Sequence, residues 1–268
     1  WKYDGVNAPS MVADIDPSGD SNPTSLTVFN NELYFQANDG TNGYELWKYD
    51  GVSTSMVADI NPSDSSTPND FVVFDNVLYF EASDGTNGAE LWKYDGTNAL
   101  NSLSMVADIH PGSSSSSPAS LYVYNNEIYF RAYDGIHGNE LWKSDGTAVG
   151  TSMVYDLNPG SSSSMPWGLT FFDTDLYFRA DDGTHGQELY RIDIFTPYPI
   201  LVSDIRSGSD SSYPSDLTVF NNELYFTAYD GNEEELFMYN GVDAPSMVAD
   251  ISKHSSAPSS YPSGLTVF

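Results

Sequence analysis

The heptapeptide Glu45-Leu46-Trp47-Lys48-Tyr49-Asp50-Gly51 decides the fold of this chain, because it returns along the sequence at a regular interval. It recurs at residues 90–96 and 140–146, in altered form at 188–194 and 235–241, and its last five residues open the chain. A second motif, Val-Ala-Asp-Ile around Asp14, recurs five times with its aspartates 45 to 49 residues apart. The chain is therefore one structural unit repeated along its length.

Each repeat is predicted to contain four short β-strands. In the first full unit the sequence favours strands at residues 26–29, 32–37, 45–50 and 55–60. The pair Asn30-Asn31 is a two-residue turn that tolerates positive φ, so it should join the first two strands as a hairpin. The predicted strands are rich in Val, Ile, Tyr, Phe and Trp, as pleated surfaces favour, and no stretch has a helical period.

Four antiparallel strands in a repeat of this length indicate a β-propeller, an all-β fold in which each repeat forms one blade. Radial packing covers both faces of every blade and leaves only short edges, whereas a β-solenoid repeats faster and a sandwich does not repeat identically. We expect a single propeller domain over residues 1–268, with blades that begin at residues 24, 69, 119, 167 and 215.

A sixth blade is expected to be shared between the two ends of the sequence. Residues 1–15 match a third and a fourth strand, and residues 264–268 match a first strand. The 17 residues that separate such segments elsewhere, as between Phe29 and Trp47, are absent. This predicts a ring of six blades closed from both ends, with an incomplete sixth blade, within a longer chain. The missing second strand would come from that longer chain or from another protomer, and a ring of seven or eight blades remains an alternative.

The composition limits the classes of partner. The chain carries 38 acidic and 9 basic side chains, a formal net charge of −29. Nucleic acids and anionic lipid surfaces are polyanions, so this charge argues against both. No apolar run approaches the ~20 residues that a membrane helix needs, so no membrane insertion is expected. Cysteine is absent, which excludes disulfides, thiolate metal sites and a cysteine nucleophile.

The string Glu-Leu-Trp-Lys-Ser-Asp-Gly-Thr at residues 140–147 resembles the signature of the ELWxxDGT-repeat proteins. The resemblance extends over essentially the whole chain, although the units at 188–194 and 235–241 depart from the signature. Members of that family are large, mostly bacterial, secreted or surface proteins, and the strand order looks like that of kelch-type blades. The resemblance implies an extracellular or cell-surface location and no catalytic role, and it names no ligand.

The glycine-rich loop of each repeat offers oxygen atoms at alternate positions, as loops that bind a hard cation do. In the first full repeat these residues are Asp39, Thr41 and Glu45. The acidic pair recurs as Asp84 with Glu90, Asp134 with Glu140, and Asp182 with Glu188. Calcium is therefore a candidate ligand, and no other cofactor is expected. The alternative is that the aspartate only forms the turn and that the glutamate hydrogen-bonds to loop amides.

Two aromatic residues are candidate ligand contacts because they interrupt the repeat. Trp167 stands at a blade entry where the other units carry a small or polar residue. Tyr198 lies in an irregular segment, residues 193–199, that takes the place of a standard turn. Trp47 and its equivalents recur at one strand position, which favours packing between blades over sugar stacking. Asp14 recurs in every unit, which favours a structural hydrogen bond over a catalytic acid.

These features predict a non-catalytic extracellular module, either a structural spacer or an adhesion or interaction unit of a larger surface or filament protein. Its partners would be other proteins, further copies of itself, or glycans. A lectin-like propeller with sugar pockets between blades is the first alternative. A glycan-active hydrolase is the second, although the breaks in the repeat contain no acid–base set.

Overall fold

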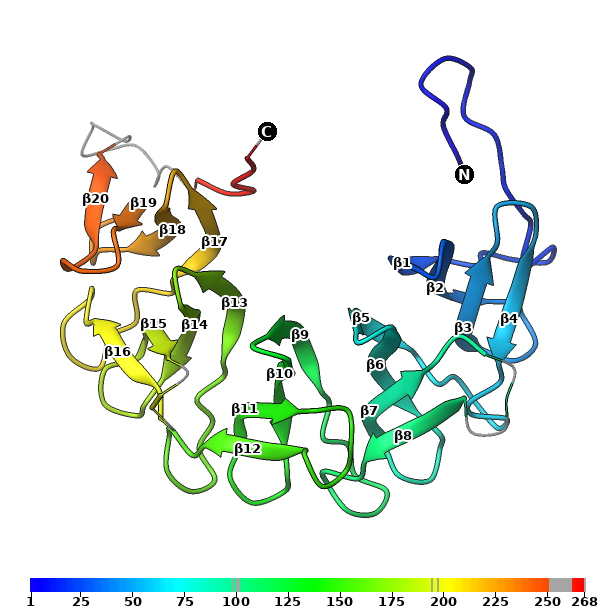
Figure 1. Cartoon of the computed structure of the whole chain (residues 1–268), viewed down its shortest axis with the longest axis horizontal. Helices are drawn as coiled ribbons and strands as arrows, with labels where there is room; N and C mark the ends of the chain where they lie inside the picture. The colour runs from blue at the N-terminus through cyan, green and yellow to red at the C-terminus, as the bar shows by residue number, and fades with distance from the viewer. Residues whose placement is uncertain (98, 100–101, 194, 197, 251–261, 268) are drawn as a thin grey trace. The chain divides into compact units, whose positions relative to one another are not determined.

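The computed structural model describes residues 1–97, 99, 102–193, 195–196, 198–250 and 262–267, and this part of the chain contains strands and no helix. Twenty strands form five antiparallel sheets of four strands each (Figure 1). Each sheet is one repeat of the sequence and is called a blade below. The predicted four-stranded repeat is confirmed.

The five blades follow one another along the chain. Blade 1 consists of β1 (Thr24–Phe29), β2 (Glu32–Asn38), β3 (Tyr44–Tyr49) and β4 (Thr54–Ala58). Blade 2 consists of β5 (Asn69–Phe74), β6 (Val77–Ser83), β7 (Ala89–Tyr94) and β8 (Leu103–Ala107). Blade 3 consists of β9 (Ala119–Tyr124), β10 (Glu127–Tyr133), β11 (Asn139–Ser144) and β12 (Ser152–Tyr155). Blade 4 consists of β13 (Trp167–Phe172), β14 (Asp175–Asp181), β15 (Gln187–Ile192) and β16 (Ile200–Ser203). Blade 5 consists of β17 (Ser215–Phe220), β18 (Glu223–Tyr229), β19 (Glu234–Tyr239) and β20 (Ser246–Ala249).

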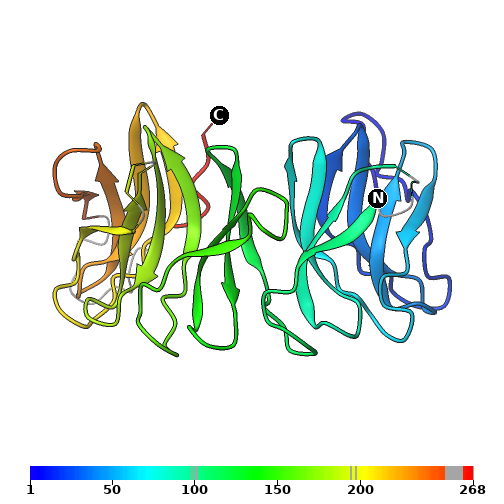
Figure 2. The same ribbon diagram turned by 60° about the horizontal axis from the view of Figure 1, so that its bottom comes forward.

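Within each blade the four strands lie side by side in chain order, each paired with the next (Figures 1 and 2). The first two strands are joined by the two-residue turn that the sequence predicted. In blade 1, Asn30 and Asn31 have φ of 49° and 62°, which matches the right-handed twist of the flanking strands. Asparagine tolerates this left-handed region better than most residues, so the Asn-Asn pair specifies the hairpin locally.

The expected sixth blade is wrong, because the described residues form five. Residues 1–15 contain only an isolated bridge between Lys2 and Ser10, and residues 262–267 contain no strand. The physical reason is visible in the complete blades, where the second strand pairs with both the first and the third. Without it, the first strand has no partner within the blade and the third strand has none on one side. Residues 251–261 and Phe268, which belong to the same expectation, lie outside the described residues.

The segment near residue 264 still makes a contact that recurs between blades. The backbone amide of Gly264 donates to Asp216 Oδ2 at 2.8 Å. The backbone amide of Ser120 donates to Asp70 Oδ2 at 2.9 Å in the same way. This segment therefore keeps the inter-blade hydrogen bond of a first strand without being a strand itself.

The chain divides into two compact units, residues 1–123 with 145–151, and residues 124–144 with 152–268. In the first unit, aromatic and aliphatic side chains of blades 1 and 2 share one core, and Trp92 packs against it as predicted for its repeat position. In the second unit, blades 4 and 5 share an equivalent core around Phe172 and Phe226. No helix with the length and hydropathy of a membrane span occurs in the described part of the chain.

Candidate functional site

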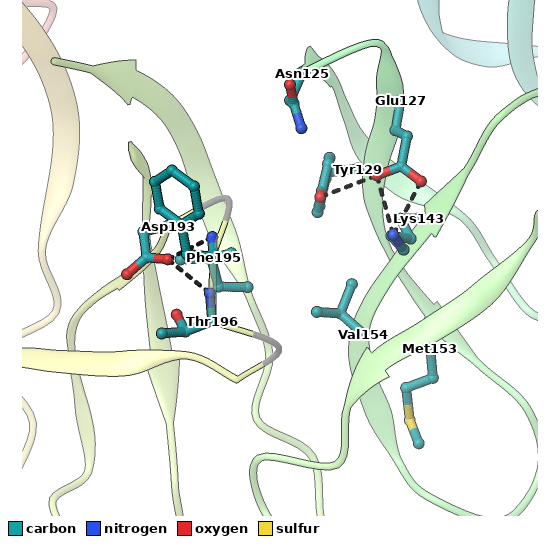
Figure 3. A pocket seen from close by; sticks show the side chains of 10 residues that line it. Asn125, Glu127, Tyr129, Lys143, Met153, Val154, Asp193, Phe195 and Thr196 are labelled. Carbon is teal, nitrogen blue, oxygen red and sulfur yellow. Dashed lines mark hydrogen bonds and ion pairs between the residues drawn. The ribbon is translucent and has the colours of Figure 1, made fainter. Parts of the chain in front are cut away.

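The candidate site begins with three polar side chains on blade 3. Glu127 and Tyr129 lie on β10 and Lys143 on β11, where Tyr129 and Lys143 are paired across the strands. Lys143 Nζ donates to the two Glu127 carboxylate oxygens at 2.9 and 3.1 Å, and the Tyr129 hydroxyl donates to Glu127 at 3.3 Å (Figure 3). Burial raises the pKa of Tyr129, so its hydroxyl keeps its proton and remains a donor.

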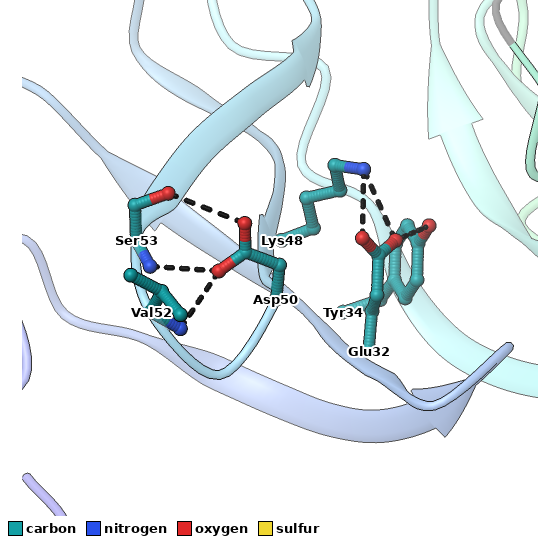
Figure 4. Close-up of polar contacts among 6 residues, drawn as sticks. All are labelled: Glu32, Tyr34, Lys48, Asp50, Val52 and Ser53. Carbon is teal, nitrogen blue, oxygen red and sulfur yellow. Dashed lines mark hydrogen bonds and ion pairs between the residues drawn. The ribbon is translucent and has the colours of Figure 1, made fainter.

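Blade 1 carries the same three residue types at the same repeat positions. Glu32 accepts hydrogen bonds from Lys48 Nζ at 3.0 Å to each oxygen and from the Tyr34 hydroxyl at 2.8 Å (Figure 4). The bond from Tyr34 and then that from Lys48 lower the pKa of Glu32, which keeps it ionised. The three residues are therefore a repeated structural element. The feature that distinguishes blade 3 is the cavity that these residues line.

In blade 3 the three polar residues line a cavity of about 480 Å³. This volume is in the range of pockets that hold a small ligand. All of the lining residues belong to the second unit. The cavity is bounded on the blade 3 side also by Asn125, Met153 and Val154, and on the blade 4 side by Ile192, Asp193, Phe195 and Thr196 (Figure 3).

A tyrosine fills the corresponding space at two other blade interfaces. The ring centroid of Tyr94 in blade 2 lies 5.8 Å from that of Tyr34 in blade 1. The centroid of Tyr239 in blade 5 lies 5.9 Å from that of Tyr177 in blade 4. Between blades 3 and 4 the same strand position holds Ile192, which is shorter and has no ring. The cavity therefore lies at an interface where isoleucine takes the place of this tyrosine.

The turn after the third strand also differs in sequence between the repeats. In blade 3 this turn contains Gly146, with φ of 87°, and a Cβ there would overlap the Tyr79 hydroxyl of blade 2. Blade 4 has Ile194 at this position, a residue outside the described part of the chain. A residue with a side chain cannot come as close to the neighbouring blade as Gly146 comes to the Tyr79 hydroxyl. In sequence, blade 4 therefore lacks the glycine that so close an approach requires.

The turn of blade 4 nevertheless keeps the hydrogen bonds of the repeat. Asp193 Oδ1 accepts from the backbone amides of Phe195 and Thr196, each at 2.7 Å, as Asp50 Oδ1 accepts from the amide of Val52 at 2.8 Å (Figures 3 and 4). The expectation that residues 193–199 replace a standard turn is thus wrong for their first part. Phe195 takes the position of Val52, and it is 87 % exposed beside the cavity.

Both aromatic residues predicted as ligand contacts are about half exposed. Trp167, at the start of β13, is 44 % exposed, and Arg131 Cζ lies 5.4 Å from the centroid of its ring. Tyr198 packs against Tyr155 with their ring centroids 6.4 Å apart. Neither lines the cavity, whereas Phe195 does. The sequence signal for Phe195 is its place two residues after the turn aspartate, where other repeats carry valine or threonine.

The loop aspartates that were candidate calcium ligands bind their own loops. Asp39 Oδ1 accepts from the backbone amides of Thr41 and Asn42 at 2.9 and 2.8 Å, and Asp39 Oδ2 accepts from the Asn42 side chain at 2.8 Å. The bond from the Asn42 amide is the main cause that lowers the pKa of Asp39. The same hydrogen bonds recur at Asp84, Asp134 and Asp182, where the side-chain partners are Asn87, His137 and His185.

The loop glutamates engage different partners. Glu45 is fully buried, and its carboxylate accepts from the Ser66 hydroxyl at 2.6 Å and from the amides of Ser66 and Ile60 at 2.9 Å. An equivalent serine hydroxyl lies within 2.6 Å of Glu90, Glu140 and Glu188. Burial raises the pKa of all four glutamates, to about 7 for Glu140. In each repeat the aspartate and the glutamate therefore belong to separate hydrogen-bond networks.

One group of three carboxylates occurs in the described part of the chain. Single carboxylate oxygens of Glu233, Glu235 and Asp250 lie within 4.8 Å of one another in blade 5. None of the predicted calcium ligands belongs to this group. Its blade is the one whose shortened loop lacks the acidic pattern of the others.

The aspartate of the Val-Ala-Asp-Ile motif has a structural partner in two repeats. Asp156 Oδ2 accepts from the backbone amide of Gly160 at 3.1 Å. Asp204 Oδ2 accepts from the amide of Gly208, also at 3.1 Å. The predicted structural hydrogen bond is therefore present at these two positions, where it ties the end of the fourth strand to the turn that follows.

Comparison with known proteins identifies the fold. No protein-family model matches the chain, and no curated protein sequence matches it. The β-propeller domain of the trilobed protease from Pyrococcus furiosus matches with a TM-score of 0.51 at 10 % identity, over 85 % of this chain and 71 % of that one. The fold is a β-propeller.

Two further solved structures match this propeller equally well. A GH74 enzyme from Niastella koreensis has a TM-score of 0.51 and 12 % identity, over 84 % of this chain and 38 % of the enzyme. Hydrazine synthase from Kuenenia stuttgartiensis has a TM-score of 0.51 and 9 % identity, over 86 % of this chain and 39 % of the synthase. The propeller spans about two fifths of the length of these two proteins, and at such identities the likeness concerns the fold alone.

Proposed function

We propose that this chain is a non-catalytic β-propeller module that binds a carbohydrate in the cavity between blades 3 and 4. It acts as an adhesion or interaction unit of a larger extracellular or cell-surface protein, with glycans and other proteins as its partners. The observation that carries the proposal is the cavity of about 480 Å³ at the interface where blade 4 has lost both the tyrosine and the turn glycine of the repeat.

The lining of the cavity suits a sugar. The exposed ring of Phe195 offers an apolar surface to the C–H face of a pyranose. On the opposite wall, Glu127 supplies acceptor oxygens, while Lys143 and the side-chain amide of Asn125 supply donors (Figure 3). An apolar surface facing a few convergent polar groups is the usual composition of a small-molecule site.

Binding is favoured over hydrolysis by the state of the carboxylates. Glu127 already accepts hydrogen bonds from Lys143 and Tyr129, and Asp193 accepts from two backbone amides. A glycoside hydrolase needs one carboxylic acid that holds a proton for the leaving group and a second carboxylate across the scissile bond. Both acidic side chains at the cavity instead hold local structure in place, which supports a module that binds without reacting.

The proposal is tested with a glycan array, followed by calorimetric titration of the best neutral oligosaccharide. Ile192→Tyr restores the residue of blades 2 and 5 and should fill the cavity, with a loss of affinity of at least about tenfold. Phe195→Val restores the residue of blade 1 and should weaken binding, while Val52→Ala, at the same turn position of blade 1, should leave it unchanged.

Three outcomes would overturn the proposal. They are the absence of glycan binding by the unaltered protein, an affinity that Ile192→Tyr does not change, and the release of shorter products from the bound oligosaccharide. The last outcome would favour the glycan-active hydrolase instead.

A further inference from the structure

A second break in the repeat lies at the start of blade 4. In the blades where this register is established, the first residue of the first strand is paired with the fifth residue of the second strand. In three of them the two side chains are hydrogen-bonded to each other: Thr24 with Gln36 at 3.1 Å, Asn69 with Glu81 at 2.6 Å, and Ser215 with Thr227 at 2.7 Å. In blade 4 the pair is Trp167 and Arg179.

Trp167 cannot satisfy the side chain of Arg179. Indole has one N–H donor and no acceptor, whereas the guanidinium group carries five N–H donors. Arg179 has no hydrogen-bond or ion-pair partner among the residues that the structure describes, and its Nε is buried without one. Burial lowers the pKa of Arg179; the nearby phenol of Tyr213 opposes this, and the positive charge of Arg131 adds to it.

The absence of an acidic partner for Arg179 among the described residues is energetically unfavourable, and it is unexpected in a strongly acidic chain. The protein has 38 acidic side chains and 9 basic ones, so acidic partners are abundant. A partly buried guanidinium beside a second arginine, without a carboxylate of its own, loses solvation and gains repulsion. A bound anion removes both penalties, because arginine presents a planar fork that matches the two oxygens of a carboxylate.

Large side chains surround the same two arginines. The ring of Trp167 lies under Arg131, with Cζ 5.4 Å from its centroid, and 44 % of the residue is exposed. Tyr213 is 54 % exposed and has φ of 52°, at a position where blade 1 carries Asn22. Arg131, Trp167, Arg179 and Tyr213 are called the Arg–Trp patch below.

We propose that the Arg–Trp patch is a second binding site, which takes a uronic acid residue of an acidic glycan. Arg179 binds the sugar carboxylate, and the exposed face of Trp167 stacks on the pyranose ring. The patch shares no residue with the cavity beside Phe195, so this site does not depend on the binding of a neutral sugar there.

The test is calorimetric titration with an oligomer of glucuronic acid, and with the neutral glucose oligomer of the same length, at physiological ionic strength. Arg179→Gln places in blade 4 the residue that blade 1 has as Gln36, so the variant should fold. Arg206→Gln is the matched control, because Arg206 is ion-paired with Asp210 and stacks on Tyr229. It changes the net charge by the same amount.

We expect the unaltered protein to bind the acidic oligomer, Arg179→Gln to bind it at least about tenfold more weakly, and Arg206→Gln to bind it within twofold of the unaltered protein. Trp167→Thr should weaken binding as well, whereas Ile192→Tyr, which fills the separate cavity, should not. No binding of the acidic oligomer would overturn the proposal. So would equal losses in the two arginine variants, since that would indicate a general effect of charge. Tighter binding of a sulfated glucose oligomer, which carries sulfate and no carboxylate, would overturn the choice of a carboxylate.

Discussion

The Ser116 hydroxyl donates a 2.6 Å hydrogen bond to the Glu90 carboxylate, and neither side chain has any exposed surface. The two residues are 26 positions apart, since Glu90 lies on β7 and Ser116 lies in the tract that leads to blade 3. The backbone amides of Ser116 and Ile109 donate to the same carboxylate at 3.0 and 2.9 Å. The glutamate of the repeated heptapeptide therefore holds the connection between one blade and the next.

Replacing Ser116 by alanine should lower the free energy of unfolding by about 1–3 kcal/mol, because a buried carboxylate loses a donor. Denaturant unfolding of the variant and of the unaltered protein measures the difference. Ser113→Ala, in the exposed part of the same tract, is the control and should change little. Equal stability of the two variants would show that the hydrogen bond to Glu90 contributes nothing.

Removal of divalent cations with a chelator should change the melting temperature by less than about 2 °C. The reason is that the oxygens of Asp39 and Glu45 already accept hydrogen bonds from protein donors. Thermal unfolding followed by tyrosine and tryptophan fluorescence, with and without chelator, provides the measurement. A large decrease that added calcium reverses would assign the glycine-rich loops as metal sites.

Stability should fall as the pH rises from about 6 to 8, and two histidines should account for part of this change. The hydrogen bonds to Asp134 and Asp182 raise the pKa of His137 and His185. The folded state thus holds these protons more tightly than the unfolded chain, whose histidine pKa is about 6.5. The contribution to stability is fully present below that pH and is lost as the pH rises through the higher folded pKa.

The variant with both His137→Asn and His185→Asn tests this directly, since asparagine occupies the same loop position as Asn42 and Asn87 in blades 1 and 2. Its free energy of unfolding should depend less on pH over this range than that of the unaltered protein. The buried glutamates titrate in both proteins and cancel in the comparison. An identical pH dependence would mean that the two histidines do not titrate differently on folding.

Replacement by alanine should lower stability by different amounts at two glycines in equivalent turns. Gly51 and Gly146 both have positive φ, but a Cβ on Gly51 meets nothing within 4 Å, while one on Gly146 would overlap the Tyr79 hydroxyl. Gly51→Ala should therefore cost only the backbone strain, about 1 kcal/mol, and Gly146→Ala clearly more. Melting temperatures of the two variants would reveal the difference, and equal shifts would argue against close packing of the turn of blade 3 on blade 2.

The four-stranded repeat and its hairpins could be predicted from the sequence, because the interactions responsible act between neighbouring residues. Asn30-Asn31 selects a tight turn through its own backbone preferences. The length of this turn then sets the register of the two strands that it joins. A sixth blade could not be judged in this way, since its first and third strands depend on a second strand that would pair with both.

The sequence by itself determined the fold class of this protein, the strands of each blade and the tight turn at Asn30-Asn31. Only the tertiary structure decided that Glu45 meets Ser66, that Ile192 leaves a cavity beside Glu127, and that Arg179 faces a tryptophan without an acceptor. The physical reason is that turn and strand preferences are local. The partner of a buried carboxylate, the size of a cavity and the solvation of a guanidinium depend instead on segments that packing brings together from distant parts of the chain.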